Sequence, residues 1–161
     1  YMEAGLGSLN NPQYWLYDSL ILSALYTQVS VWKKLKFHRQ IVSNRNKLKK
    51  PALSSPQNGL HKYRLIEAEL ARIGNKPDTA IQKYDEAIHA ARENRYKNEE
   101  ALADELKALF LLSENKRNDA AVYFQAAHRC YSEWGALAKV RHLEERFPAF
   151  FTGPTIQNDA G

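Results

Sequence analysis

The side chains most capable of chemistry in this sequence are five histidines, one cysteine and several carboxylates. The histidines are His38, His61, His89, His128 and His142. None of them lies four residues from another, and there is no H-E-x-x-H motif, so the helical spacing of a metal site is missing. No G-x-x-x-x-G-K-[ST] or G-x-G-x-x-G loop is present to cradle a phosphate. We therefore expect no metal and no cofactor.

The other reactive groups have simpler structural explanations. Cys130 falls between Ala127 and Trp134 in a predicted helix, which favours a buried structural thiol over a redox sensor. His142 has glutamates close by, as a phosphoacceptor histidine does, but its short terminal helix favours an ordinary surface histidine. Six carboxylates are typical of solvated helix faces: Glu67, Glu69, Glu99, Glu100, Asp104 and Glu105. We expect no catalytic residue and no enzyme activity in this chain.

The elements that carry these side chains are predicted to be helices. The chain has 161 residues, 44% of them apolar and 25% charged, which suits one compact domain. Only 7 glycines and 6 prolines argue against a barrel or sandwich of short strands. A single cysteine excludes an intrachain disulfide, and no signal peptide or membrane-spanning run is visible. We expect a cytoplasmic helical segment, taken from a larger protein because it begins at Tyr1.

The positive charge is concentrated in one predicted helix. The net charge is +5, yet residues 33–50 hold eight of the 23 basic residues and none of the 18 acidic ones. An apolar stripe there, Leu35, Phe37, Ile41, Val42 and Leu48, is predicted to pack inward. The predicted basic docking face comprises Lys33, Lys34, Lys36, Arg39, Lys47, Lys49 and Lys50.

Three partners remain possible for this basic helix. We favour a solvated face or one that docks on an acidic neighbouring domain. A nucleic acid or an anionic membrane is the less favoured alternative, since no aromatic residue interleaves Lys47–Lys50 to stack on bases.

The sequence repeats itself from Leu60 onward with an offset of 40 residues. The matched pairs are Ala68 and Ala108, Leu70 and Phe110, Asn75 and Asn115, Lys76 and Lys116, Ala80 and Ala120, Tyr84 and Phe124, and Ala87 and Ala127. Alanines allow neighbouring helices to approach, and the aromatic residues fill the space beside them. Asparagine tolerates the left-handed conformation in which a chain leaves a helix. Each unit is therefore predicted to be a pair of helices.

These signals predict an all-α fold of about seven helices. We expect a linker at 1–11, a domain at 12–148 with helix pairs at 12–50, 60–94 and 98–134, a terminal helix at 136–147, and a linker at 149–161. The apolar run at 14–26 should be covered on most faces. Pro51 should end the basic helix, and PALSSPQNG at 51–59 should form a loop.

The second helix of each unit resembles that of a tetratricopeptide repeat. AIQKYDEA at 80–87 and AAVYFQAA at 120–127 carry the Ala-x-x-x-aromatic-x-x-Ala pattern, although the period is about 40 rather than 34 and the consensus tryptophan and glycine are missing. The resemblance implies a right-handed α-solenoid with a peptide-binding groove. The groove positions would be Lys62, Leu65, Glu69, Arg72, Leu102, Glu105, Leu109 and Leu112. A neighbouring helix of the same protein could instead cover these leucines.

A second resemblance covers most of residues 14–148. YDEAIHAARENRYKNEEALADELKA at 84–108 and CYSEWGALAKVRHLEERFP at 130–148 are similar to the helical segment of large bacterial multi-sensor signal-transduction histidine kinases. In that family a serine/threonine-kinase-like head and an AAA/STAND-type ATPase precede the segment, and a GAF sensor and a histidine-kinase core follow it. The resemblance implies a non-catalytic relay or scaffold that binds protein, either neighbouring domains or a signalling partner. A free-standing adaptor is the alternative.

Overall fold

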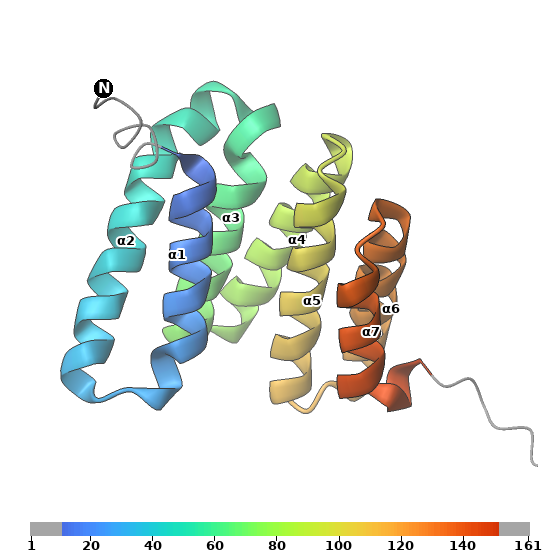
Figure 1. Cartoon of the computed structure of the whole chain (residues 1–161). Coiled ribbons are helices and arrows are strands. Elements are labelled where there is room, and N and C mark those ends of the chain that lie inside the picture. Colours follow the sequence, from blue (N-terminus) through green and yellow to red (C-terminus); the bar gives the residue numbers. More distant parts are fainter. Residues whose placement is uncertain (1–10, 152–161) are drawn as a thin grey trace, which may run out of the picture.

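The computed structural model describes residues 11–151, and this part of the chain is almost entirely helical, with no strand (Figure 1). The seven α-helices are α1 (Pro12–Leu25), α2 (Val31–Ser54), α3 (Pro56–Ile73), α4 (Pro77–Glu93), α5 (Lys97–Ser113), α6 (Arg117–Trp134) and α7 (Leu137–Arg146). Two short 3₁₀ helices follow α1 and α7, at Tyr26–Gln28 and Pro148–Phe150. The all-α prediction is confirmed for these residues. Most of both predicted linkers lies outside them.

The helices pack in chain order as three hairpins and a final helix. α1 packs on α2, α3 on α4, and α5 on α6, while α2 also packs on α3 and α4 on α5. α3 touches both α1 and α5, so alternate helices lie side by side, and α7 closes the array against α6 (Figure 1). Among the described elements, none packs on the outer side of α1 and α2.

Left-handed residues close four of the described helices, and at the end of α6 this residue is Gly135, with φ of 83°. Asn75 and Asn115 have φ of 54° and 60°, as their repeated position predicts, and Arg95 adopts φ of 61° at the end of α4. After each, the next backbone N–H bonds back into the helix, as in Lys76 to the Ala71 carbonyl at 2.9 Å. Nothing in the residue type indicates this conformation at Arg95, because arginine seldom adopts it.

The predicted loop at 51–59 is wrong. α2 continues through Pro51 to Ser54, and the chain breaks only at Ser55 before α3 starts at Pro56. Proline costs that turn one N–H bond, but Ala52 is fully buried against α3 and holds the turn in place. Gly59 lies inside α3, where an added Cβ would come within 3.2 Å of the Ala52 Cα atom. This glycine therefore serves close helix packing rather than a turn.

Replacing Pro51 with alanine should stabilise the protein by about 1–2 kcal/mol. Alanine restores a helical N–H bond and is favoured over proline by about 3 kcal/mol inside a helix. About 1 kcal/mol of this gain is lost, because the unfolded chain has more conformational freedom without the proline. Urea denaturation followed by circular dichroism measures the change. A destabilised variant would show that the helix needs a bend at Pro51.

The repeated alanines and aromatic residues form the core. Tyr84 and Phe124 are completely buried, and so are Ala80 and Ala120 beside them, which agrees with the packing role that their spacing predicts. Close packing of this kind requires small residues where helix axes approach. These matched positions of the repeat are therefore explained by contacts between helices.

Two apolar stripes are less buried than predicted. In α2, Ile41 and Leu48 are buried, but Leu35 is 45% exposed, so its predicted inward orientation is wrong. In α1, which was expected to be covered on most faces, one stripe stays open: Tyr14, Tyr17, Ile21 and Leu25. Both departures have one cause, since no described element packs against the outer side of α1 and α2. Among the described helices, none combines the length and the apolarity that crossing a bilayer would require.

Candidate functional site

The outward face of α2 is the most distinctive surface of the described chain. Residues spaced three and four apart along it line two shallow hollows of about 550 and 450 Å³. Trp32, Leu35, Lys36, Arg39 and Gln40 line the first, and Asn46, Lys49, Lys50, Leu53 and Ser54 line the second. All ten belong to one helix, and we call them the α2 face.

The α2 face combines exposed apolar groups with positive charge. Trp32 is 83% exposed and Leu53 is 56% exposed. Water contact with such side chains is unfavourable, and the two lie in separate hollows, Trp32 beside Leu35 in the first and Leu53 in the second. Exposed apolar groups gathered beside charge are typical of an interaction site. Four of the seven predicted docking residues, Lys36, Arg39, Lys49 and Lys50, lie on this face.

The other three predicted docking residues lie apart from the α2 face. Lys34 rests over the Tyr26 ring, with its Nζ 5.7 Å from the ring centre, and Lys47 rests over the Trp15 ring at 5.8 Å. Lys33 is exposed. The structure therefore divides the predicted basic cluster, and only part of it can meet a single flat partner.

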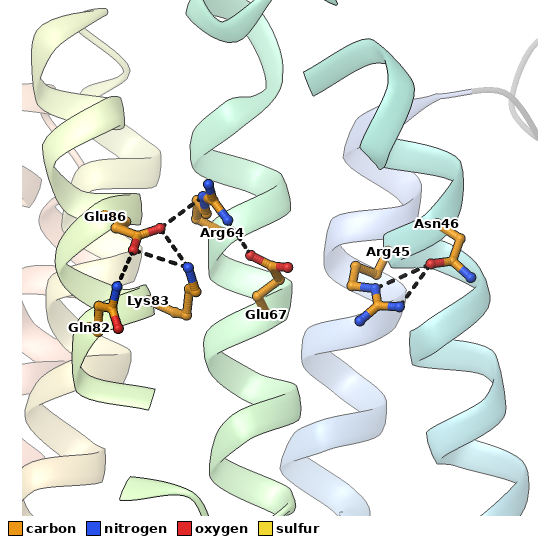
Figure 2. Close-up of polar contacts among 7 residues, drawn as sticks. All are labelled: Arg45, Asn46, Arg64, Glu67, Gln82, Lys83 and Glu86. Atoms are coloured by element: carbon orange, nitrogen blue, oxygen red, sulfur yellow. Dashed lines mark hydrogen bonds and ion pairs between the residues drawn. The ribbon is translucent and has the colours of Figure 1, made fainter. Parts of the chain in front are cut away.

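No acidic side chain of the described residues pairs with a basic residue of α2. The contrast with the next helices is clear in Figure 2, where Arg64 of α3 bonds Glu67 at 2.7 Å and Glu86 of α4 at 2.9 Å. Arg45 of α2 reaches only Asn46 on its own helix, at 2.9 Å (Figure 2). The charge of α2 is thus uncompensated within the described fold.

The predicted groove is mostly filled. Four of its eight positions, Lys62, Leu65, Glu69 and Glu105, are buried, with 6% or less of their surface exposed, so their expected place outside the packing rows is wrong. The other four, Arg72, Leu102, Leu109 and Leu112, are half-buried. The structure brings three of the eight, Glu69, Arg72 and Leu109, to one cavity of about 270 Å³ between α1, α3, α5 and α7.

The polar side chains that line this cavity already form hydrogen bonds with one another and with the backbone. Tyr84 donates a short hydrogen bond to Glu69, whose other carboxylate oxygen accepts from Arg72 at 2.6 Å. The same arginine donates to the Ser23 carbonyl at 3.0 Å and so ties α1 to α3. Burial and the adjacent carboxylate raise the pKa of Tyr84 well above its usual value. This network holds three helices together and leaves little free polarity for a ligand.

A second buried network involves α5, α6 and α7. Tyr131 donates to Glu105 Oε2 at 2.7 Å, and Lys139 donates to Glu105 Oε1 at 3.0 Å. α7 therefore covers the predicted groove position at Glu105. Lys62, at the other end of the groove, is enclosed by Tyr96 and Glu99, with its Nζ 3.5 Å from the Glu99 carboxylate.

The carboxylates predicted to be solvated are mostly buried, which corrects that expectation. Glu69, Glu99, Glu100, Asp104 and Glu105 are each 6% exposed or less, and only Glu67 is half-exposed. α5 carries four of them. Glu99 and Glu100 are held by cations, and Glu105 by Lys139 and Tyr131, whereas neither carboxylate oxygen of Asp104 has a partner. Sequence spacing alone could not show that α5 is interior.

Cys130 is buried as predicted, at 2% exposed. Burial, with Glu100 and Asp104 nearby, raises the pKa of its thiol to about 11. Burial likewise raises the pKa of Asp104 to about 7. His142 is exposed on α7, which agrees with its interpretation as a surface histidine.

Comparison with known proteins shows a similarity over part of the chain but no family. No protein-family model matches the chain, and no solved structure matches it. It is 40% identical over 58 residues to hybrid signal transduction histidine kinase G of Dictyostelium discoideum. That match covers 36% of this chain and 2% of the relative. The chain is therefore similar, over about a third of its length, to a small part of a signal-transduction histidine kinase.

Proposed function

We propose that this chain is a non-catalytic protein-docking segment of a larger cytoplasmic signalling kinase of the two-component type, built as a right-handed tetratricopeptide-like solenoid. The α2 face carries this proposal, because its exposed tryptophan and leucines are flanked by cations that no described residue neutralises. The histidine-kinase similarity supports a signalling context. The successive packing of helix pairs supports the solenoid.

The partner we propose is an acidic, amphipathic protein segment. Tryptophan and arginine are the residues most enriched among those that dominate interface energetics, and Trp32 lies beside Lys36 and Arg39 in one hollow. Carboxylates of a partner would pair with the four cations, and its apolar side chains would cover Trp32 and Leu53. The charge steers the encounter, and the apolar contact supplies the affinity.

A synthetic amphipathic helix with glutamate on its polar face and leucine on the other provides the first test. Trp32→Ala should weaken its binding by about 10- to 30-fold, as expected for an interface tryptophan. Lys49→Glu with Lys50→Glu should weaken it further and flatten its dependence on salt. Isothermal titration calorimetry measures both. Trp134→Ala, a tryptophan 55% exposed on α6, and Arg141→Glu on α7 are matched controls that should leave binding unchanged.

The competing partners give different results in the same assay. Duplex DNA or phosphatidylserine vesicles that bind more tightly than the peptide, and lose binding steeply with salt, would favour the nucleic-acid or membrane alternative. Equal peptide binding by wild type and Trp32→Ala would contradict the proposed face.

Sequencing the gene on both sides of the segment distinguishes a relay from an adaptor. Kinase and ATPase motifs upstream, with sensor and histidine-kinase motifs downstream, support docking within one chain. A start codon just before Tyr1 and a stop codon just after Gly161 would instead favour a free-standing adaptor with a separate partner.

A further inference from the structure

Three metal-ligating side chains meet at the buried interface of α5 and α6. Glu100 and Asp104 stand one turn apart on α5, and Cys130 faces them from α6. One donor atom of each lies within 4.8 Å of the other two. The three residues are 3%, 1% and 2% exposed, so this cluster is interior rather than a solvated acidic patch.

Asp104 has no partner for either of its carboxylate oxygens. A carboxylate without hydrogen bonds is costly to bury, and native proteins seldom tolerate one without a compensating ligand or ion. One oxygen of this carboxylate lies within 4.8 Å of a donor atom of Glu100 and of Cys130, and no cation of the described residues forms an ion pair with it. Its missing partner is thus an observation separate from the proximity of the cluster.

The other two donors also have free coordinating capacity. Arg92 of α4 donates to Glu100 Oε1 at 2.7 Å, which leaves Oε2 with only a 3.9 Å ion pair to Lys97. Cys130 forms no disulfide. The sulfur of Cys130 and a carboxylate oxygen from each of Glu100 and Asp104 therefore lie close together.

The geometry points to a site for a divalent cation of the zinc class, bound by Cys130 Sγ, one Asp104 oxygen and Glu100 Oε2, with water as the fourth ligand. Thiolate with carboxylate is a donor set that zinc accepts in tetrahedral coordination. Bonds of about 2.0–2.3 Å to such a centre place its donors about 3.5 Å apart. The three donor atoms already lie within 4.8 Å of one another, so binding requires them to approach by about 1 Å.

The charges around the cluster suit a bound dication. Binding forms one metal–sulfur bond and two metal–oxygen bonds and releases the thiol proton of Cys130 to solvent. Where Asp104 is protonated, its proton is released to solvent as well. The three anionic ligands then exceed the cation by one negative charge, which the Arg92 guanidinium offsets. Other charged groups near the cluster are Lys97 and Lys107 on α5 and Arg129 and Glu133 on α6. Arg92 and Lys97, whose side chains are about half exposed, both form ion pairs with Glu100.

Cadmium provides a direct test, because a cadmium–thiolate bond has an ultraviolet charge-transfer band that carboxylate or histidine ligands alone do not produce. The complete 161-residue chain, stripped with chelator and kept reduced, is titrated with Cd²⁺ and then with Zn²⁺ in competition. We expect the band to saturate at one ion per chain and Zn²⁺ to displace it. Cys130→Ala should abolish the band, and Asp104→Asn should weaken binding by at least about 100-fold.

Controls separate this site from surface binding and from misfolding. His89→Gln and His128→Gln remove histidines that pair with glutamates on the surface and should leave the band unchanged. Circular dichroism and thermal melts establish that each variant is folded, and Glu100→Gln gives a second test of a ligand should one of the others unfold. Absence of the band, or equal affinity in Asp104→Asn, would overturn the proposal. Loss of the band in a histidine control would do so too.

Discussion

Replacing Phe124 with alanine is expected to lower the free energy of unfolding by about 3–5 kcal/mol. Phe124 is completely buried in α6 and lies at the centre of an aromatic group formed with the last described residues. Its ring centre is 4.5 Å from that of Phe147 and 4.9 Å from that of Phe150. Truncation therefore leaves a cavity and also releases the segment that follows α7.

Urea denaturation measures this loss as a lower midpoint with an unchanged slope. Val122→Ala, two residues away and 63% exposed, is the matched control and should change stability by less than about 0.5 kcal/mol. A Phe124→Ala loss below about 1 kcal/mol would show that the aromatic group is not part of the core. It would also remove the basis for α7 and Pro148–Phe150 as the closing elements of the array.

Acid is expected to destabilise the protein through His61. This ring is 2% exposed and stacked on Tyr96, with ring centres 4.4 Å apart. Its Nε2 accepts a hydrogen bond from Lys62 at 2.9 Å, which requires the neutral imidazole. Burial, followed by the charge of Lys62, lowers the pKa of His61 from 6.5 to about 3.

The sign of the effect follows from which state binds the proton. Between pH 6.5 and 3 the unfolded chain carries a proton on His61 and the folded chain does not, so stability is present above pH 6.5 and is lost as the pH falls. The loss at pH 3 is on the order of 4 kcal/mol.

Unfolding free energies of wild type and His61→Gln, measured across this pH range, isolate the contribution of His61. Their difference should grow as the pH rises from 3 to 6.5 and be constant above it. His142→Gln, at an exposed histidine of α7, should give a flat difference. A flat curve for His61→Gln as well would mean that His61 titrates normally in the folded protein.

The order of the helices and the turns at Asn75 and Asn115 could be predicted from the sequence, whereas the turn at Arg95 and the α2–α3 connection could not. Left-handed Asn75 and Asn115, the proline that opens α4, and the buried alanines with Tyr84 and Phe124 all follow from local conformational preference and repeat spacing. These are short-range effects, because a turn or a close helix contact restricts which residue can stand at one position.

The candidate sites could be predicted only in part from the sequence. The sequence identified the basic residues of α2, but only the packing separates those beside Trp32 and Leu53 from those that rest on rings of α1 and the turn after it. The groove was placed by analogy with repeats that keep it open, and here α7 and paired side chains fill much of it. The prediction that Pro51 ends α2 is wrong for a related reason. The energetic cost of a proline in a helix can be recognised from the sequence, whereas the burial of Ala52, which offsets that cost, depends on the packing of α2 against α3.

Residue spacing and local preference were enough to predict successive helical hairpins with one strongly basic helix. Which helix faces remain open and which carboxylates are interior became clear only from the packing of the helices. Helical periodicity indicates which residues share a face of a helix. Whether that face is buried depends on elements that are distant in the chain. Glu100, Asp104 and Cys130 meet only because α5 packs on α6, and the α2 face is exposed only because no described helix lies beyond it.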